Sequence, residues 1–193
     1  MISLEDIATR LDRLESHNAI AELASAYAIA CDERDLKRLA GLFTVDAVFD
    51  SCNGLMKANG RQAIHDIFIK IFMNRGPALH WTHDKFIRFD DSDPNRAAGQ
   101  VLSQADTTVD DVVCKAAMKY DDTYRREDGI WRFASRTIHY LYYVPVTEFS
   151  NSLNRTERVH LNGIARPADY PENLESWQAY EREFLTSVAS ITE

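Results

Sequence analysis

Histidine and aspartate are the residues of this sequence whose surroundings suggest acid–base chemistry. Asp32 stands in the polar stretch CDERD, where a long helical pattern ends, and His80 stands in a segment that is otherwise apolar. An imidazole titrates near neutral pH, so it can accept and release a proton under working conditions. Taken singly, each residue also has an ordinary structural explanation, as a loop aspartate and as a core histidine whose ring is hydrogen-bonded.

Other chemical signatures are missing from the sequence. The cysteines number three and are isolated, at Cys31, Cys52 and Cys114, which argues against a disulfide framework or a structural zinc site. The stretch His80-Trp81-Thr82-His83 has no convergent carboxylate or thiol, so we expect no metal there. We find no phosphate-binding glycine loop, no dinucleotide fingerprint and no Gly-x-Ser-x-Gly turn. The sequence therefore predicts chemistry without a cofactor.

Length and charge narrow the class of protein. The chain has 193 residues, 45% of them hydrophobic, which suits one folded domain with a real core. Its net charge is -8, with 22 basic and 30 acidic residues and no basic stripe, so we expect no nucleic-acid partner. No apolar stretch reaches the length of a membrane span or of a signal peptide. We expect a cytoplasmic protein without a membrane partner.

The elements that must position these residues follow from periodicity and turn signals. Helical spacing predicts helices first, and alternating patterns then predict a short strand and four long strands. Helices followed by a long antiparallel sheet are typical of an α+β fold, and a curved sheet leaves a concave face suited to a ligand. The expected helices are 4–31, 36–43 and 61–74, and the expected strands are 45–51, 79–89, 97–109, 112–127 and 130–144.

The C-terminal part of the sequence has a different character. Residues 1–145 form the expected domain, and residues 146–193 form an extension that is polar at first and ends in an amphipathic helix. Such an apolar helix face must pack on its own domain or on a neighbouring subunit. The apolar positions of this helix are Leu174, Trp177, Phe184, Leu185, Val188 and Ile191.

Four segments together resemble a known superfamily over about residues 5–145. They are YAIACDERDLKRLAGLFTVDAVFD, GRQAI, LHWTHDKFIRF and YDDTYRREDGIWRFASR, and they resemble the SnoaL-like branch of the nuclear-transport-factor-2-like superfamily. That resemblance implies a cone-shaped curved antiparallel sheet packed on about three N-terminal helices. Its members include scytalone dehydratase, a bile-acid 7α-dehydratase, a hexachlorocyclohexane dehydrochlorinase, polyketide cyclases, steroid isomerases and subunits without catalytic function. The fold therefore does not decide the reaction.

The resemblance pairs Asp32 with His80. In the dehydratases and the dehydrochlorinase, an aspartate at the end of the first long helix pairs with a histidine on the strand after the third helix. A carboxylate that accepts a hydrogen bond from one imidazole nitrogen fixes the tautomer and leaves the other nitrogen free as a base. The resemblance thus implies that His80 is the general base and that Asp32 orients it.

The resemblance also implies assisting residues. Tyr27 matches a tyrosine that some members use, and its hydroxyl could donate to the leaving group. Arg136 matches a pocket arginine of the dehydrochlorinase, which would orient Asp32 or stabilise developing negative charge. An ordinary strand arginine is the alternative for Arg136. Tyr140 falls where the family lines its pocket.

Three further points concern the pocket. Phe49 and His83 are expected to contact the substrate, although the odd spacing of His83 from His80 places it on the opposite strand face unless a bulge intervenes. The fungal dehydratase has a tyrosine on its first strand, where this sequence has Asp50, Ser51 and Cys52. The group that would help a hydroxyl to leave is therefore missing from its usual place.

Three functions compete on this basis. The first is a cofactor-independent lyase of the dehydratase type, which acts on a small hydrophobic cyclic or polyketide-like molecule. The second is an isomerase that moves a proton along a conjugated ketone, with Asp106 as its carboxylate. The third is a non-catalytic ligand-binding or assembly subunit, favoured by the long C-terminal extension. In each case we expect a homo-oligomer, a dimer or a trimer.

Overall fold

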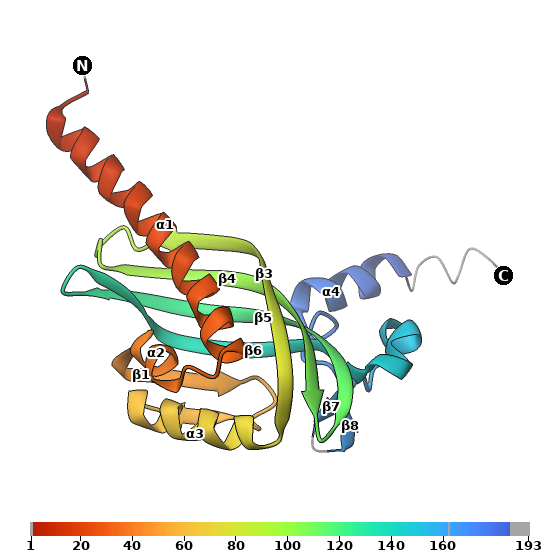
Figure 1. Cartoon of the computed structure of the whole chain (residues 1–193). Coiled ribbons are helices and arrows are strands. Elements are labelled where there is room, and N and C mark those ends of the chain that lie inside the picture. The colour runs from red at the N-terminus through yellow and green to blue at the C-terminus, as the bar shows by residue number, and fades with distance from the viewer. Residues whose placement is uncertain (1, 162, 186–193) are drawn as a thin grey trace.

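The computed structural model of the chain describes residues 2–161 and 163–185. Helices come first and long strands follow, in the order that periodicity predicts (Figure 1). The helices are α1 (Leu4–Asp32), α2 (Leu36–Gly41), α3 (Arg61–Met73) and α4 (Glu175–Tyr180). The strands are β1 (Phe43–Ser51), β2 (Lys57–Asn59), β3 (Arg75–Phe89), β4 (Arg96–Val109), β5 (Val112–Glu127), β6 (Ile130–Pro145), β7 (Val159–Leu161) and β8 (Ile164–Arg166).

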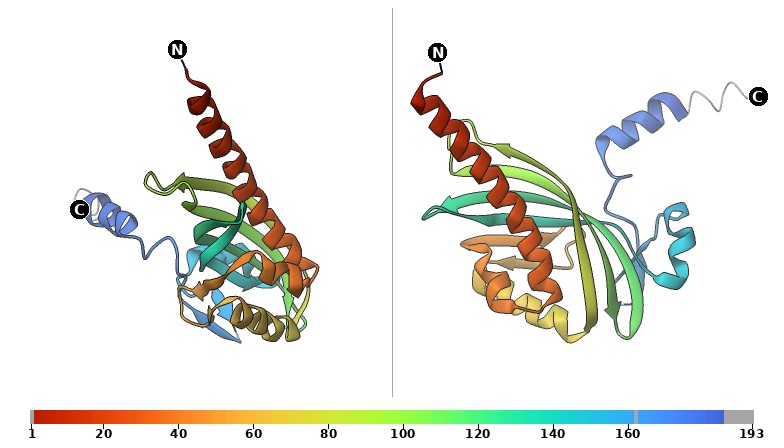
Figure 2. Two further views of the ribbon diagram at one scale, coloured as in Figure 1. Left: turned by 90° about the vertical axis from the view of Figure 1, so that its left-hand side faces the viewer. Right: turned by 45° about the horizontal axis from the view of Figure 1, so that its top comes forward.

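Helix α1 begins at a capping box and ends at the site. The Ser3 hydroxyl accepts from the backbone N–H of Asp6, whose carboxylate accepts from the N–H of Ser3, both at 3.0 Å. The buried face of α1 begins at Ser16 and continues through Ile20, Leu23 and Tyr27. The first half extends past the edge of the sheet, as two views show (Figures 1 and 2). Packing therefore fixes the C-terminal end of α1.

The main sheet has the order β2-β1-β6-β5-β4-β3 and curves around α3 and the end of α1 (Figure 1). Strands β3 to β6 form an antiparallel meander, which confirms the α+β prediction. One pairing departs from the expected antiparallel sheet, because β1 runs parallel to β6, with Phe49 opposite Arg136. No hairpin joins these two strands, so turn geometry does not impose an antiparallel direction on them.

The core fills the space between the helices and the concave face of the sheet. Rings dominate it: Phe43 and Phe133 lie 5.2 Å apart between centroids, and Phe49 and Phe68 lie 5.1 Å apart. Each of these four side chains is almost completely buried. Aromatic burial on this scale stabilises the junction of β1, β6 and α3, on which the site depends.

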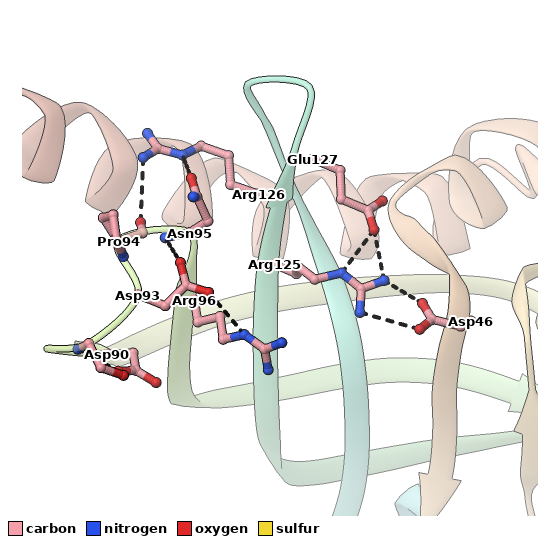
Figure 3. Close-up of polar contacts among 10 residues, drawn as sticks. Asp46, Asp90, Asp93, Pro94, Asn95, Arg96, Arg125, Arg126 and Glu127 are labelled. Atoms are coloured by element: carbon pink, nitrogen blue, oxygen red, sulfur yellow. Dashed lines mark hydrogen bonds and ion pairs between the residues drawn. The ribbon is translucent and has the colours of Figure 1, made fainter.

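Charged residues join the strands at the hairpin between β5 and β6 (Figure 3). Arg125 contacts Asp46 of β1 and Glu127 of its own strand, with Nη2 2.7 Å from the Glu127 carboxylate. Arg126 donates to the Asn95 side chain at 2.9 Å and also reaches Asp12 of α1 at 2.7 Å. These partly exposed pairs link α1, β1 and the sheet, and each contributes little singly.

The C-terminal extension packs on its own chain up to about residue 173. Buried Arg158 donates to the carbonyls of Leu141 at 2.7 Å and Arg155 at 2.8 Å, and to the Glu172 carboxylate at 2.7 Å. Asp169 accepts from the backbone N–H of Tyr140 at 3.0 Å. Hydrogen bonds of this kind fix the extension along β6, beside the site.

Helix α4 behaves differently from the rest of the extension. None of its residues is buried, and it stands away from the sheet in both figures that show the whole chain (Figures 1 and 2). Trp177 is 42% exposed and Tyr180 is 58% exposed. The expected apolar residues Val188 and Ile191 lie outside the described residues. Packing of this helix on a neighbouring subunit stays a prediction. Within the described residues, no helix is long and apolar enough to cross a membrane.

Candidate active site

Asp32 and His80 meet through two hydrogen bonds. Oδ1 of Asp32 lies 2.5 Å from Nδ1 of the His80 ring, and Oδ2 accepts the backbone N–H of His80 at 2.8 Å. Each side chain is 16% exposed. Because a carboxylate can only accept, the proton of the neutral ring belongs on Nδ1, and Nε2 is left as a base. The carboxylate thus fixes both the position and the tautomer of the ring.

The local fold explains how Asp32 reaches this position. It is the last residue of α1, where the helix dipole disfavours a negative charge by about 0.3–1 kcal/mol at an exposed site. The two N–H donors of His80 offset that cost. Arg34 follows in a left-handed conformation (φ 55°), and its guanidinium donates to the carbonyls of Arg75 and Gly76 at the start of β3. This contact joins the end of α1 to the strand that carries His80.

The dyad lines a cavity whose walls are mostly apolar and carry a few polar groups, a character typical of sites for small organic ligands. Its walls come from α1, α3 and the concave face of the sheet. The apolar lining residues are Phe49, Met56, Phe68, Ile71, Phe72, Ala78, Ala105, Ala116, Met118 and Ile138, and the polar ones are Tyr27, Cys31, Asp32, Arg34, Arg75, His80, Thr107, Tyr120, Tyr140 and Tyr143.

Buried tyrosine hydroxyls supply hydrogen-bond donors in the cavity. Burial raises the pKa of Tyr140 to about 12 and raises the pKa of Tyr27 well above its ordinary value. Burial likewise raises the pKa of the Cys31 thiol to about 12. All three groups therefore keep their protons at neutral pH. These neutral donors line the same cavity as the base, together with the charged side chains of Arg34 and Arg75.

Arg136 lies beneath the cavity wall. Its guanidinium makes two hydrogen bonds to Asp122, at 2.8 and 2.7 Å, and the exposed fractions of the two side chains are 1% and 0%. It also lies 4.3 Å from the ring centre of Tyr27 and 4.1 Å from that of Tyr120. The structure thus places Arg136 on Asp122, where the sequence suggested Asp32, and its contact with the cavity runs through the two tyrosines.

The other expected residues are divided between the cavity and the outer surface. Phe49 and Tyr140 line the cavity, as Tyr27 does. His83 is exposed and is not among the lining residues, although an extra residue between Thr82 and Lys85 does form the bulge that the odd spacing required. Substrate contact by the residues in the cavity stays a prediction.

Sequence reasoning missed three residues of the site and its support. Tyr120 and Asp122 are two residues apart on β5, and both are buried. Because side chains two residues apart on a strand lie on the same face, a strand that directs Tyr120 inward also directs Asp122 inward. The sequence alone gives neither residue a role in the site. Arg75 enters the cavity at the first residue of β3, where no sequence pattern indicates the direction of its side chain.

Metal binding finds no support in the part of the chain that the structure describes. No group of three histidine, cysteine, aspartate or glutamate side chains comes together there in a way that could hold an ion. The polar groups of the cavity are instead a carboxylate–imidazole pair, arginines and hydroxyls. This set suits proton transfer to and from a bound organic molecule.

Comparison with known proteins finds relatives that are named as dehydrochlorinases. A γ-hexachlorocyclohexane dehydrochlorinase of Sphingobium indicum is 28% identical over 137 residues, which are 70% of this chain and 87% of the relative. The crystal structure of LinA matches with a TM-score of 0.66 at 25% identity, covering 72% of this chain and 94% of that one.

Likeness of fold extends to a second group. A Novosphingobium aromaticivorans protein provisionally assigned as a scytalone dehydratase matches with a TM-score of 0.67 at 19% identity, over 85% of this chain and 98% of that one. At this identity only the fold is shown. The model of the SnoaL-like domain family matches residues 12–137, well over half of the chain. The chain therefore belongs to the SnoaL-like domain family.

Proposed function

We propose that this protein is a cofactor-independent lyase of the dehydratase type, which acts on a small hydrophobic cyclic or polyketide-like molecule. The observation that carries the proposal is the Asp32–His80 pair, with hydrogen bonds of 2.5 and 2.8 Å at the wall of an apolar cavity. Similarity to a dehydrochlorinase, which is an elimination enzyme by its name, supports the same class of reaction.

The reaction would begin at Nε2 of His80. The nitrogen takes a proton from a substrate carbon, and the electrons of that C–H bond form a carbon–carbon double bond. The leaving group on the adjacent carbon departs with its own electron pair, and a hydroxyl group that receives one proton leaves as water. Asp32 stabilises the imidazolium formed in this step, because its charge faces the protonated ring.

A tyrosine would supply the proton to the leaving group. The first strand offers no tyrosine for this purpose, but Tyr27 and Tyr140 line the same cavity as His80 and keep their protons at neutral pH because burial raises the pKa of each. Arg136 acts as a positioning residue in this proposal. Its guanidinium lies against the ring of Tyr27, so it holds that ring in place and stabilises negative charge on its oxygen.

The position of Asp106 favours the lyase over the isomerase. An isomerase of this kind needs a carboxylate deep in the pocket. Asp106 pairs across β3 and β4 with exposed Leu79, its side chain is 46% exposed, and it makes an ion pair with Lys115 at 2.7 Å. These contacts belong to the outer face of the sheet, away from the cavity.

Turnover of a panel of cyclic and polyketide-like β-hydroxy ketones tests the proposal. We expect the product mass to fall by one water, and His80→Ala to abolish the reaction. Asp32→Asn should slow it by about 10³–10⁴-fold, since an amide favours the wrong tautomer of the ring. Exposed His83→Ala, on the same strand, should leave the rate unchanged. A product with the same mass as the substrate would indicate isomerisation. Full activity of His80→Ala would contradict the proposed mechanism. Ligand binding without turnover across the panel would favour the binding subunit.

A further inference from the structure

Arg75 brings a positive charge into the dyad cavity. Nη1 of its guanidinium donates to the hydroxyl of Tyr143 at 2.9 Å, and its central carbon lies 5.4 Å from the centre of the same ring. Both residues line the cavity together with Asp32 and His80. The guanidinium therefore borders the space that a substrate would occupy.

A bulge at the start of β3 turns Arg75 toward this space. Arg75 and His80 are five residues apart, and in a regular strand that odd spacing places two side chains on opposite faces. Arg75 pairs with Val109 and Ala78 pairs with Thr107. Between these two pairings β3 advances by three residues and β4 by two, so β3 contains one extra residue. The extra residue reverses the alternation and brings both side chains to the concave face.

Small residues leave room between Arg75 and the base. His80 pairs with Ala105, Ala105 with Ala116, and Ala116 with Tyr143, so these four residues form one row across β3 to β6. The two alanines between His80 and Tyr143 are buried and line the cavity. From β6 the Tyr143 hydroxyl reaches back to Arg75 of β3 and Thr107 of β4, so a ligand that contacts His80 can extend over the alanines to the guanidinium.

The charge of Arg75 is not neutralised by the residues that the structure describes. No carboxylate of residues 2–161 or 163–185 lies within 4.0 Å of its nitrogens, and Asp32 is paired with His80. A guanidinium has five N–H donors, and Tyr143 accepts one of them. Burial raises the pKa of Tyr140 and of Tyr143, and the Arg75 charge opposes both increases. The charge thus acts inside the cavity.

We propose that Arg75, together with Tyr143, binds a carboxylate of the substrate in the same cavity as His80. The substrate class would then be a cyclic or polyketide-like acid, with the reacting carbon at His80 and the carboxylate at Arg75. An arginine matches a carboxylate through two parallel N–H donors, and the apolar lining suits the ring of such an acid. This inference rests on the lyase proposal for the reaction and adds a specificity-determining residue to the same site.

Binding of two unreactive probes tests the inference without any turnover. Cyclohexanecarboxylate and the neutral, similarly shaped cyclohexanecarboxamide are titrated into the wild-type protein by calorimetry. We expect the acid to bind about tenfold to a hundredfold more tightly, as a charge-assisted hydrogen bond provides. Arg75→Met should abolish the preference, and Arg75→Lys should restore part of it. Arg88→Met removes an exposed charge from the same strand and should leave the preference intact.

The outcomes separate this inference from the lyase proposal. Equal binding of acid and amide to the wild-type protein would overturn it, and so would a preference that survives in Arg75→Met. If Arg75→Met does not fold, the comparison of wild type with Arg75→Lys decides, and an unchanged ratio between them counts against the inference. His80→Ala should keep the preference for the acid. Loss of turnover in His80→Ala is governed by the base alone, so each proposal can fail while the other stands.

Discussion

The buried pair of Arg136 and Asp122 supports the cavity wall, and removal of its carboxylate is a direct perturbation of that support. In Asp122→Ala the guanidinium loses both of its hydrogen bonds and remains among the rings of Tyr27, Tyr120 and Phe133. Burial alone would lower the pKa of Arg136, but the charge and hydrogen bonds of Asp122 outweigh burial and raise it. The variant therefore leaves a buried cation without a partner.

The expected loss in the free energy of unfolding follows from the burial of both partners. Breaking a fully buried pair by removing one member costs about 3–5 kcal/mol, whereas an exposed pair contributes about 0–1 kcal/mol. The hydroxyl of Tyr124, which donates to Asp122 at 2.8 Å, also loses its acceptor. In a protein of this size the change should lower the midpoint of thermal unfolding by roughly 6–20 °C.

Urea unfolding of matched variants measures this cost. Asp91→Ala removes a carboxylate that is 98% exposed and 4.0 Å from Arg13, and it should change the free energy of unfolding by less than about 0.5 kcal/mol. Replacing both partners, as in Asp122→Leu with Arg136→Met, should recover much of the loss because no charge remains buried. A cost for Asp122→Ala as small as that for Asp91→Ala would refute the reasoning.

Three other predictions concern packing, pH and assembly. Gly99→Ala should lower the free energy of unfolding in urea by about 1–3 kcal/mol, because the new Cβ would lie 2.7 Å from the Phe86 carbonyl oxygen. In the control Gly41→Ala the new Cβ meets no atom within 4 Å, so the stability should be unchanged or higher. Burial raises the pKa of Tyr140 to about 12, above the unfolded value near 10, so its contribution to stability is complete below pH ~10 and is lost between about pH 10 and 12. Unfolding and tyrosinate absorbance should rise together in that range, and ionisation of Tyr140 within a folded protein near pH 10 would contradict this. Leu79 and Trp81 are 52% and 43% exposed on the outer face of β3. Because an exposed apolar face of this kind marks an interface, sedimentation equilibrium should show a dimer or trimer at micromolar concentration. A monomer would contradict this prediction.

Periodicity predicted the elements well because each long element has one buried face. The expected strand 112–127 coincides with β5, and the expected helix 61–74 differs from α3 by one residue. Alternation along β5 places Tyr120 and Asp122 on the same face, so the inward position of Asp122 was also available from the sequence. Carboxylates are rarely fully buried, so the residue type of Asp122 indicates the opposite face from its position in the pattern.

Other features depend on contacts that no local pattern encodes. The parallel pairing of β1 with β6 joins strands distant in sequence, and the bulge after Arg75 is a matter of register between β3 and β4. For the same reason the sequence could not assign Arg136 to Asp122. The distance between Asp32 and His80 was accessible only through the family resemblance, because 48 residues separate them.

The tautomer of His80 is the most direct test of the claim that Asp32 prepares it as a base. Nitrogen-edited NMR of the neutral imidazole should show the proton on Nδ1, in a hydrogen bond to Asp32, and Nε2 without a proton. In Asp32→Asn the proton should move to Nε2, while the signals of the other five histidines stay in place. A wild-type ring with its proton on Nε2, or a tautomer that Asp32→Asn leaves unchanged, would contradict the account.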